Sequence, residues 1–251
     1  MNNIISAWAI TFVPGLILWT WEKKDPLKEI NYSEEILEDI KNAAIMMLYI
    51  VVVVYAYYPI QNFITSAPFV EAIGWTNILS APLYSRVILA IFLREFSLYV
   101  IHWHMHYIEQ IWQTHKWHHS EQKLWWLSGV KSSLTSKLMF ASIGLWFPAL
   151  AIPAHIAIVY GAIASFHNTI SHLNIKWRPW MRVVEYVIVT PRYHHVHHLA
   201  EERFHNKNLA SMLVIFDHIF GTYFNPDLVD SQTEEYGIGE EPVTARMIVG
   251  L

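Results

Sequence analysis

The chain has 251 residues, of which 54% are hydrophobic and only 15% are charged, and its mean hydropathy is +0.25. A water-soluble domain of this length would need more charge to cover its surface, so the composition favours a membrane protein. The formal net charge of −4 argues against a nucleic-acid binder, and the absence of cysteine removes disulfides, thiolate nucleophiles and iron–sulfur ligation.

Three apolar runs occupy the first part of the chain. Ile4–Trp21 carries no charge and is long enough to cross the hydrocarbon core of a bilayer. Ala43–Val70 is a second uncharged run. The third, Ala72–Ile101, is interrupted by Arg86 and by the pair Arg94–Glu95. Charges at membrane depth usually face a protein interior or a functional cavity, so we expect three spans, the third with functional charges.

A fourth apolar run, Leu138–Asn174, contains no Lys, Arg, Asp or Glu and is too long for a single span. Pro148 and Pro153 near its middle predict two helices that form a hairpin. After Lys176 the chain turns polar and mixed, and no further segment could cross. The sequence therefore predicts an all-α fold, a polytopic membrane bundle of about four to five spans or hairpin helices, built by residues 1–251 as a single domain.

The basic residues near the span ends predict the orientation. Lys23, Lys24 and Lys41 place the first loop on the cytoplasmic side. Two further crossings return the chain to the cytoplasm after Ile101, and the hairpin leaves and returns before Lys176. The dense histidine clusters then all lie on the cytoplasmic side, as a histidine-rich cap.

Thirteen of the fifteen histidines lie between His102 and His198, mostly in three clusters. The first, His102–His106, has H-x3-H spacing, while His115–His119 and His194–His198 both have H-x2-HH spacing. Residues three or four apart share one face of a helix, so His102 with His106, or His115 with His118 or His119, can bind one metal ion.

The number of histidines says more than their spacing. Imidazole suits iron, zinc, copper and nickel, but eight histidines exceed what a four-coordinate zinc site needs, and two adjacent metals of higher coordination number account for them better. A histidine-rich surface patch is the alternative, but it does not explain why the clusters end or follow membrane spans.

The ordered motifs resemble the fatty acid hydroxylase/sterol desaturase superfamily of integral-membrane di-iron enzymes, from about Phe92 to Phe224. The matching elements are Glu95, Tyr99, His102–His106, His115–His119, His172-Leu-Asn174, Thr190-Pro-Arg-Tyr-His194-His-Val-His197-His198, Lys207-Asn208 and Asp217-His-Ile-Phe-Gly-Thr-Tyr223. Two positions depart from the family pattern, since Trp103 and His195 stand where arginine is frequent.

The resemblance implies two iron ions as cofactor and O2 as co-substrate. The implied metal ligands are His102, His106, His115, His118, His119, His172, His194, His197 and His198. Glu95, Asn208 and Asp217 are candidates to orient the ligand imidazoles through their other ring nitrogen. His104, His195 and His155 are expected to be structural and His205 and His218 to lie on the polar surface, while His167 is a possible tenth ligand.

The resulting hypothesis is a lipid monooxygenase that hydroxylates a C–H bond of a fatty acyl chain, a sterol or a related lipid. Desaturation by the same centre stays open. No flavin, haem or dinucleotide motif is visible, so electrons are expected from an external protein, cytochrome b5- or ferredoxin-like with its reductase. A bacterial inner membrane is favoured over the endoplasmic reticulum.

Two functions of other classes stay open as well. A metal-ion transporter would carry its histidines within spans near mid-membrane, whereas these clusters lie at span ends. A zinc-dependent membrane hydrolase would need a carboxylate base, for which Glu109 and Glu121 are near enough in sequence.

Overall fold

The computed structural model describes residues 2–239 and 243–251, with side chains from residue 12 onward. In this part of the chain the only extended pairings are isolated bridges, and the all-α prediction is confirmed. The α-helices are α1 (Asn2–Lys24), α2 (Tyr32–Ile64), α3 (Ala67–Ala72), α4 (Thr76–Leu79), α5 (Leu83–Tyr107), α6 (Glu109–His119), α7 (Leu134–Ser142), α8 (Trp146–Ala149), α9 (Ala154–Ser171), α10 (Pro179–Val184), α11 (Pro191–His197), α12 (Ile215–Phe220) and α13 (Ala245–Val249). Short 3-10 turns lie at Ser128–Val130, Ile143–Leu145, Glu202–Phe204 and Pro226–Leu228.

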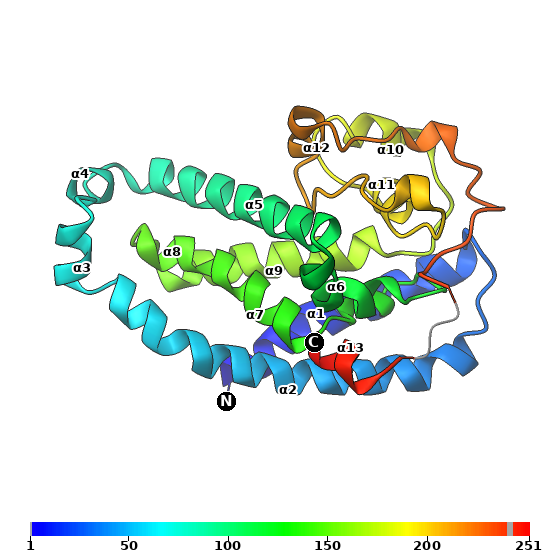
Figure 1. Ribbon diagram of the computed structural model, residues 1–251, viewed down its shortest axis with the longest axis horizontal. Helices are drawn as coiled ribbons and strands as arrows, with labels where there is room; N and C mark the ends of the chain where they lie inside the picture. Colours follow the sequence, from blue (N-terminus) through cyan, green and yellow to red (C-terminus); the bar gives the residue numbers. More distant parts are fainter. Residues whose placement is uncertain (1, 240–242) are drawn as a thin grey trace.

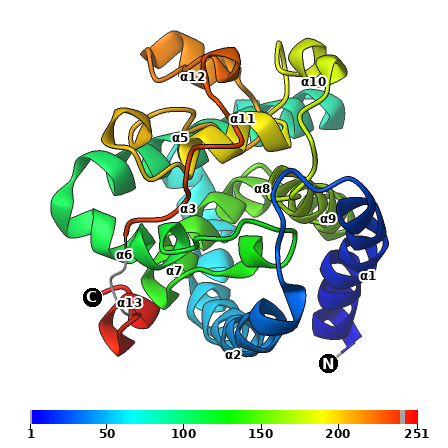
Figure 2. The same cartoon turned by 90° about the vertical axis from the view of Figure 1, so that its right-hand side faces the viewer.

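The long helices run along the longest dimension of the molecule (Figure 1). At one end α3 and α4 connect α2 to α5, and at the other end α10, α11 and α12 gather. Figure 2 looks along the helices and shows α1 beside α9 and α2 beside α7, pairs that are in contact. The segments that carry the histidine clusters therefore lie toward one end of the bundle.

Helix α2 is long and apolar enough to cross a membrane, the single such helix found among the described residues. It ends at Ile64 and does not continue to the end of the predicted run at Val70. The hydroxyl groups of Thr65 and Ser66 donate to the carbonyls of Gln61 and Phe63, and a new short helix begins at Ala67. These side-chain bonds compete with helix continuation, which a hydropathy pattern does not detect.

The third apolar run is one long helix only from Leu83 onward. Before it come the short helices α3 and α4, separated by Gly74 with a positive φ of 67°. The charged guanidinium of Arg86 finds its hydrogen-bond acceptors within the protein, because it donates to the carbonyls of Leu150 and Ala151 at 2.8 and 2.9 Å. Arg86 thus fixes α5 to the tip of the predicted hairpin.

The hairpin between residues 138 and 174 has unequal arms. Its first arm is divided into α7, a 3-10 turn at Ile143–Leu145 and α8, whereas its second arm is the continuous α9. The chain reverses at Ala151, whose φ is 50°, just before Pro153. Of the two predicted helices, the first is therefore interrupted and the second is continuous.

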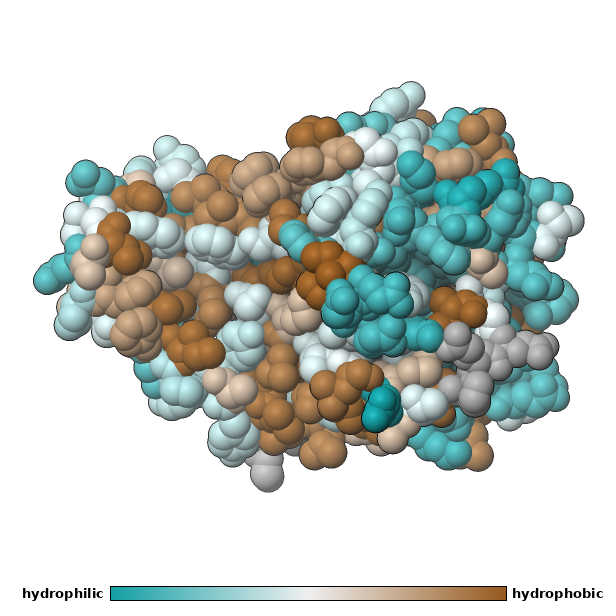
Figure 3. Space-filling view, in the orientation of Figure 1, coloured by the Kyte–Doolittle hydropathy of each residue, from teal (hydrophilic) through white to brown (hydrophobic). Residues whose placement is uncertain are grey.

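On the face drawn in Figure 3, polar side chains gather at the right-hand end, and apolar side chains are most frequent over the rest. Large apolar side chains are exposed on the long helices, among them Leu48, Tyr55, Tyr58 and Phe63 of α2, Tyr84, Ile88 and Phe92 of α5, and Ile158, Val159 and Ile163 of α9. The region after Lys176 is less uniformly polar than its sequence suggested, because Trp180, Val183, Ile215 and Ile219 on α10 and α12 are also exposed.

Glu22, near the end of α1, ties that helix to two distant loops. Its fully buried carboxylate accepts from the backbone N–H groups of Trp126 and Asn174, both at 3.0 Å, and from the hydroxyl of Tyr32 at 2.9 Å. Buried backbone donors are costly to leave without an acceptor. Glu22 therefore holds the loop before α7 and the end of α9 against α1.

We predict that Glu22→Ala lowers the free energy of unfolding by about 2–6 kcal/mol, since it leaves two buried N–H groups without an acceptor. Glu22→Gln should cost much less, because one amide oxygen can still accept both bonds while the amide N–H meets the Tyr32 hydroxyl. Thermal unfolding of the detergent-purified protein measures this, with the exposed Glu29→Ala as control. Equal effects of the Ala and Gln variants would contradict the assignment.

Candidate metal centre

The predicted metal ligands come from four elements that meet at one place. His102 and His106 lie on the last turns of α5, and the second cluster lies on α6. The third cluster lies on α11 and at its end, and His172 ends α9. Segments separated by up to about a hundred residues thus contribute to one buried site.

The nine histidines form two groups. Within each group, the ligand atoms all lie within 4.8 Å of one another. The first group is His102, His106, His115, His119 and His197. The second group is His118, His172, His194 and His198. Each H-x2-HH cluster serves both groups, because its first and last histidines, four residues apart, belong to one group and its middle histidine belongs to the other. The nine predicted ligands are brought together, and metal ligation itself stays a prediction.

The spacing between ring nitrogens fits metal ions. The Nε2 atoms of His102 and His115 are 3.0 Å apart, and the Nε2 atom of His194 lies 3.1 Å from those of His172 and His198. Two nitrogens bound at right angles to a metal at about 2.1 Å would be about 3.0 Å apart. The donor geometry of both groups therefore suits a transition-metal ion.

Unpartnered nitrogens give a second test of the fit. The Nε2 atoms of His106, His119 and His197 are buried and have no hydrogen-bond partner among the described residues. Buried polar side-chain atoms almost always have one. All three belong to the first group, where a metal ion would provide the missing partner.

Burial sets the protonation state of the cluster. Desolvation, and after it the neighbouring imidazoles, lower the pKa of His115, His119, His194 and His198 well below the usual range. The same burial lowers the pKa of His118 and His197. These rings are neutral at physiological pH, which is the form that binds metals.

Backbone carbonyls orient four of the rings. His102 Nδ1 donates to the carbonyl of Leu209 at 2.6 Å and His197 Nδ1 to that of Lys207 at 3.0 Å. In the second group, the Nδ1 atoms of His118 and His172 donate to the carbonyls of Lys131 and Asn168, at 2.9 and 2.8 Å. A carbonyl can only accept, so each Nδ1 carries the proton and each Nε2 is the free ligand atom.

Asn208 stands between the two carbonyls that serve the first group. Its φ is 54°, in the left-handed region that asparagine tolerates better than most residues. Its side-chain amide donates to the carbonyls of Tyr193 and Phe224 and accepts from the N–H of Phe224 at 2.8 Å. Asn208 does not bond a ligand imidazole, but it shapes the turn that presents Lys207 and Leu209.

Asp217 acts on the same turn. Its fully buried carboxylate accepts from the N–H groups of Leu209 and Ala210, both at 2.8 Å, and from the hydroxyls of Tyr193 and Thr222. The sequence made Asp217 a candidate to orient a ligand imidazole, or else a surface residue or helix cap. Instead it holds Leu209, whose carbonyl accepts from His102.

Glu95 lies one helical stretch before the first cluster, as the family motif places it. Among the described residues its carboxylate bonds to the guanidinium of Arg94 and to the hydroxyl of Tyr160, the latter at 2.7 Å, rather than to a histidine. Arg94 and Tyr160 both line the cavity beside the histidines. Glu95 therefore organises the cavity wall.

The remaining histidines of the described chain lie outside both groups. His104 donates to the carbonyl of Val100 on its own helix, and His167 contacts the carbonyl of Val189. His195 is buried beside the hydroxyl of Tyr236, and burial lowers the pKa of His195 to about 3. His205 is exposed and His218 stacks on Tyr223. These positions agree with the expectation that His104 and His195 are structural and that His205 and His218 lie on the polar surface.

Gly129 is a residue that the motif analysis missed. A Cβ atom at this position would lie 2.6 Å from Nδ1 of His172, so only glycine lets the loop pass this close to the ring. Its carbonyl accepts from the side chain of Asn168 at 3.1 Å. A lone glycine after serine carries no sequence signal for such a role.

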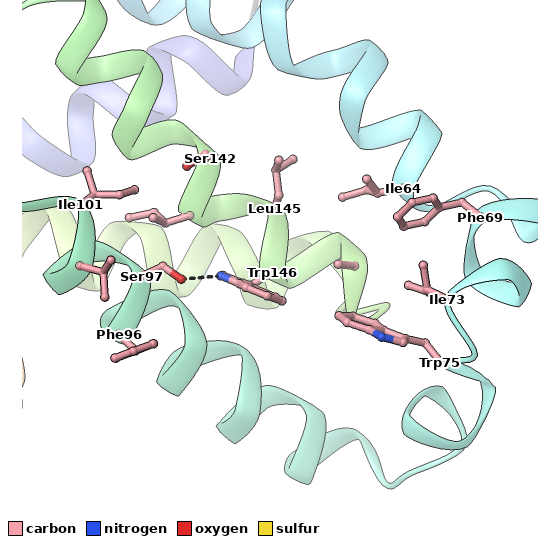
Figure 4. A pocket seen from close by; sticks show the side chains of 13 residues that line it. Ile64, Phe69, Ile73, Trp75, Phe96, Ser97, Ile101, Ser142, Leu145 and Trp146 are labelled. Carbon is pink, nitrogen blue, oxygen red and sulfur yellow. Dashed lines mark hydrogen bonds between the residues drawn. The ribbon is translucent and has the colours of Figure 1, made fainter. Parts of the chain in front are cut away.

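One cavity is lined by histidines, and a second cavity adjoins it. One, of about 500 Å³, is lined by His102, His115, His118 and His194 together with residues of α5, α7 and α9. The other, of about 650 Å³, is lined mainly by apolar side chains, including Phe69, Trp75, Phe96 and Trp146 (Figure 4). Ile143 lines both, so the apolar cavity adjoins the histidine-lined cavity at this residue.

We predict that Asp217→Asn weakens metal binding about 10- to 100-fold, the usual effect of removing a residue that orients ligands. An amide nitrogen would face N–H and O–H donors and release the turn that holds Leu209. Titration of metal-free protein with metal measures this, and the exposed Asp230→Asn is the control. Unchanged affinity in a folded Asp217→Asn protein would contradict the positioning role.

Comparison with known proteins places these residues in context. The chain is 29% identical over 146 residues to the ornithine lipid hydroxylase OlsE of Rhizobium tropici, covering 58% of this chain and 44% of that protein. It is 24% identical over 141 residues to the alkylglycerol monooxygenase of Homo sapiens and 26% identical over 138 residues to that of Danio rerio, covering 51% of this chain and 28% of each relative.

The chain spans less than half the length of these curated relatives. No solved structure matches it. The family model named Fatty acid hydroxylase matches residues 87–222, which include all nine clustered histidines. The chain belongs to the fatty acid hydroxylase family.

Proposed function

We propose that this chain is a membrane monooxygenase that holds two iron ions and uses O2 to hydroxylate a C–H bond of a lipid. The observation that carries the proposal is the pair of buried histidine groups, beside a cavity that adjoins an apolar one. Nine neutral imidazoles in two adjacent groups are far more than an ordinary zinc site requires.

The two groups are close enough to act together. The rings of His119 and His198, one from each group, have centroids 4.6 Å apart, and His118 and His119 are neighbours on α6. A bound iron pair would supply the activation of O2 and the removal of hydrogen from an unactivated carbon, which no side chain can achieve. The histidine clusters of α6 and α11 would hold both ions, because each contributes histidines to both groups.

The chain itself contributes position, protonation state and exclusion of water. In four of the rings, backbone carbonyls keep the proton on Nδ1, so their Nε2 atoms stay available as ligands. Burial of the imidazoles keeps the site dry, which protects reactive oxygen chemistry from side reactions. The apolar cavity between α3, α5 and α8 would accept the hydrocarbon part of the substrate.

Hydroxylation is favoured over desaturation because of the relatives. The names of these relatives, a hydroxylase and a monooxygenase, describe enzymes that insert oxygen into a lipid. A hydrolase would need a carboxylate base, but the histidine-lined cavity includes no Asp or Glu among its described lining residues. Glu121 is paired with Lys131 and Glu109 is exposed, so neither fits that role.

The proposed location is a bilayer, with the histidine end on the cytoplasmic side. Helix α2 is long enough to span, and exposed apolar side chains on α5 and α9 suit contact with lipid. Lys23, Lys24 and Lys41 near the polar end favour the cytoplasmic side. The similarity to a bacterial lipid hydroxylase favours a bacterial inner membrane.

We predict about two irons per chain in the protein reconstituted with iron, and lower content in both His118→Ala and His119→Ala, which change different groups. His104→Ala is the matched control, because His104 lies between two ligands on α5 but bonds to a backbone carbonyl. Elemental analysis of the purified variants measures the content. Absence of stoichiometric metal after reconstitution, or equal loss in His104→Ala, would overturn the di-iron proposal.

We also predict that the purified chain does not turn over with O2 and NAD(P)H alone, because its sequence shows no flavin, haem or dinucleotide motif. Addition of a ferredoxin- or cytochrome b5-like carrier with its reductase should start the reaction. Mass spectrometry of lipid products under O2, with anaerobic samples as control, measures this. Product formation without any added carrier would disprove the requirement for a partner.

A further inference from the structure

The cavity beside the histidines has an unusual charge balance. Three basic side chains line it, Arg94, Lys131 and Lys137, and its described lining residues include no Asp or Glu. Arg94 is paired with Glu95 and Lys131 with Glu121, so each of these charges has a carboxylate partner outside the cavity. Among the described residues, the third basic residue of the cavity lining therefore has no carboxylate partner.

That residue is Lys137, on the first turn of α7. In the described part of the chain its ammonium group makes no hydrogen bond or ion pair, although its side chain is only partly exposed. Burial alone lowers the pKa of Lys137, and no neighbouring acid opposes the shift. An ammonium group without a partner in a cavity favours an anion there, because opposite charges a few Å apart attract each other.

Metal ions in the histidine groups would increase the need for an anion. Lys137 lines the same cavity as His102, His115 and His118, and its charge disfavours protonation of His118. Positive charge from bound metals would add to that of the ammonium. A negatively charged ligand group in the cavity would offset both.

The neighbouring apolar cavity indicates what kind of molecule carries that group. It adjoins the histidine-lined cavity at Ile143, and Ala141 and Gly144 of the one alternate with Ser142 and Leu145 of the other. A molecule that fills both therefore has a long hydrocarbon part and a compact polar part. The polar part would lie among Lys137, Ser132 and Asn168.

We propose that Lys137 determines substrate specificity by pairing with an anionic oxygen group, carboxylate or phosphate, on the lipid. This proposal rests on the proposed function and names the substrate class of the same site. Since Lys137 and His118 line one cavity, the oxidised carbon lies near the charged end of the lipid rather than at the far end of its chain.

Binding to the full-length protein in nanodiscs of neutral lipid tests the proposal without turnover. The probes are a long-chain fatty acid, an alkyl phosphate and an alkanol of equal chain length. Comparing each probe between wild type and Lys137→Gln cancels its partition into the bilayer. Lys137→Gln should weaken binding of an anionic probe about tenfold and leave the alkanol unchanged.

The two anionic probes distinguish a carboxylate from a phosphate substrate, because the better match should lose more affinity. Lys137→Arg keeps the charge and should retain most of the binding. Lys24→Gln, which removes an exposed charge, controls for net charge, and the metal content of Lys137→Gln should equal that of wild type. Equal effects of Lys137→Gln on anionic and neutral probes would overturn the proposal.

The outcome is separable from that of the proposed function, since binding can be measured in metal-free and metal-loaded protein. Loss of the di-iron assignment with a persistent Lys137 effect would leave an anionic lipid site of another function. A confirmed di-iron centre with no Lys137 effect would leave the oxygenase and remove this substrate class.

Discussion

The whole site depends on burying imidazole rings in a neutral state with the proton on a chosen nitrogen. A buried ring with one N–H needs an acceptor for it, and carbonyls inside a helix are already bonded. The four carbonyls that accept from the ligand rings are all free of such bonds by position. Lys131, Lys207 and Leu209 lie in loops, and Asn168 is in the last turn of α9, where its carbonyl also accepts from the hydroxyl of Ser171. This explains why the centre is built at helix ends.

A second consequence of helix geometry is that the two groups are not independent. Each H-x2-HH cluster sends its first and last histidine to one group and its middle histidine to the other. Helices α6 and α11 therefore contribute histidines to both groups, and a displacement of either helix moves residues of both. The turn around Asn208 adds to this coupling, because Asp217 and Asn208 hold the backbone that orients His102 on α5 and His197 on α11. A single loop thus aligns two helices.

Much of this site could be predicted from the sequence, and the part that could not has a physical reason. The histidine spacings and the family motif identified all nine residues that the structure gathers, since ligand residues must be side chains of a particular kind. The assignment to groups was open, because residues three and four apart are both near neighbours on a helix and His115 could pair with either His118 or His119. The backbone carbonyls that accept from the ligand imidazoles could not be predicted, because every residue has a backbone carbonyl. Hydropathy likewise predicted apolar runs but not their breaks at Ser66 and Gly74, which depend on local hydrogen bonds and a positive φ.

The positions of the two cavities follow the division of the molecule into an apolar part and a polar end. The apolar cavity lies toward α3, where exposed side chains suit lipid, and the histidine-lined cavity lies where the polar end begins. The 3-10 turn at Ile143–Leu145 contributes residues to both, and it interrupts α7 and α8 at the point where the two cavities adjoin. The lining residues of the two cavities each follow helical spacing along this arm, Lys137, Ala141 and Gly144 on the histidine side and Ser142, Leu145 and Ala149 on the apolar side, while Ile143 lines both. Under the proposed function, the hydrocarbon and the polar end of the lipid would then be selected by different residues.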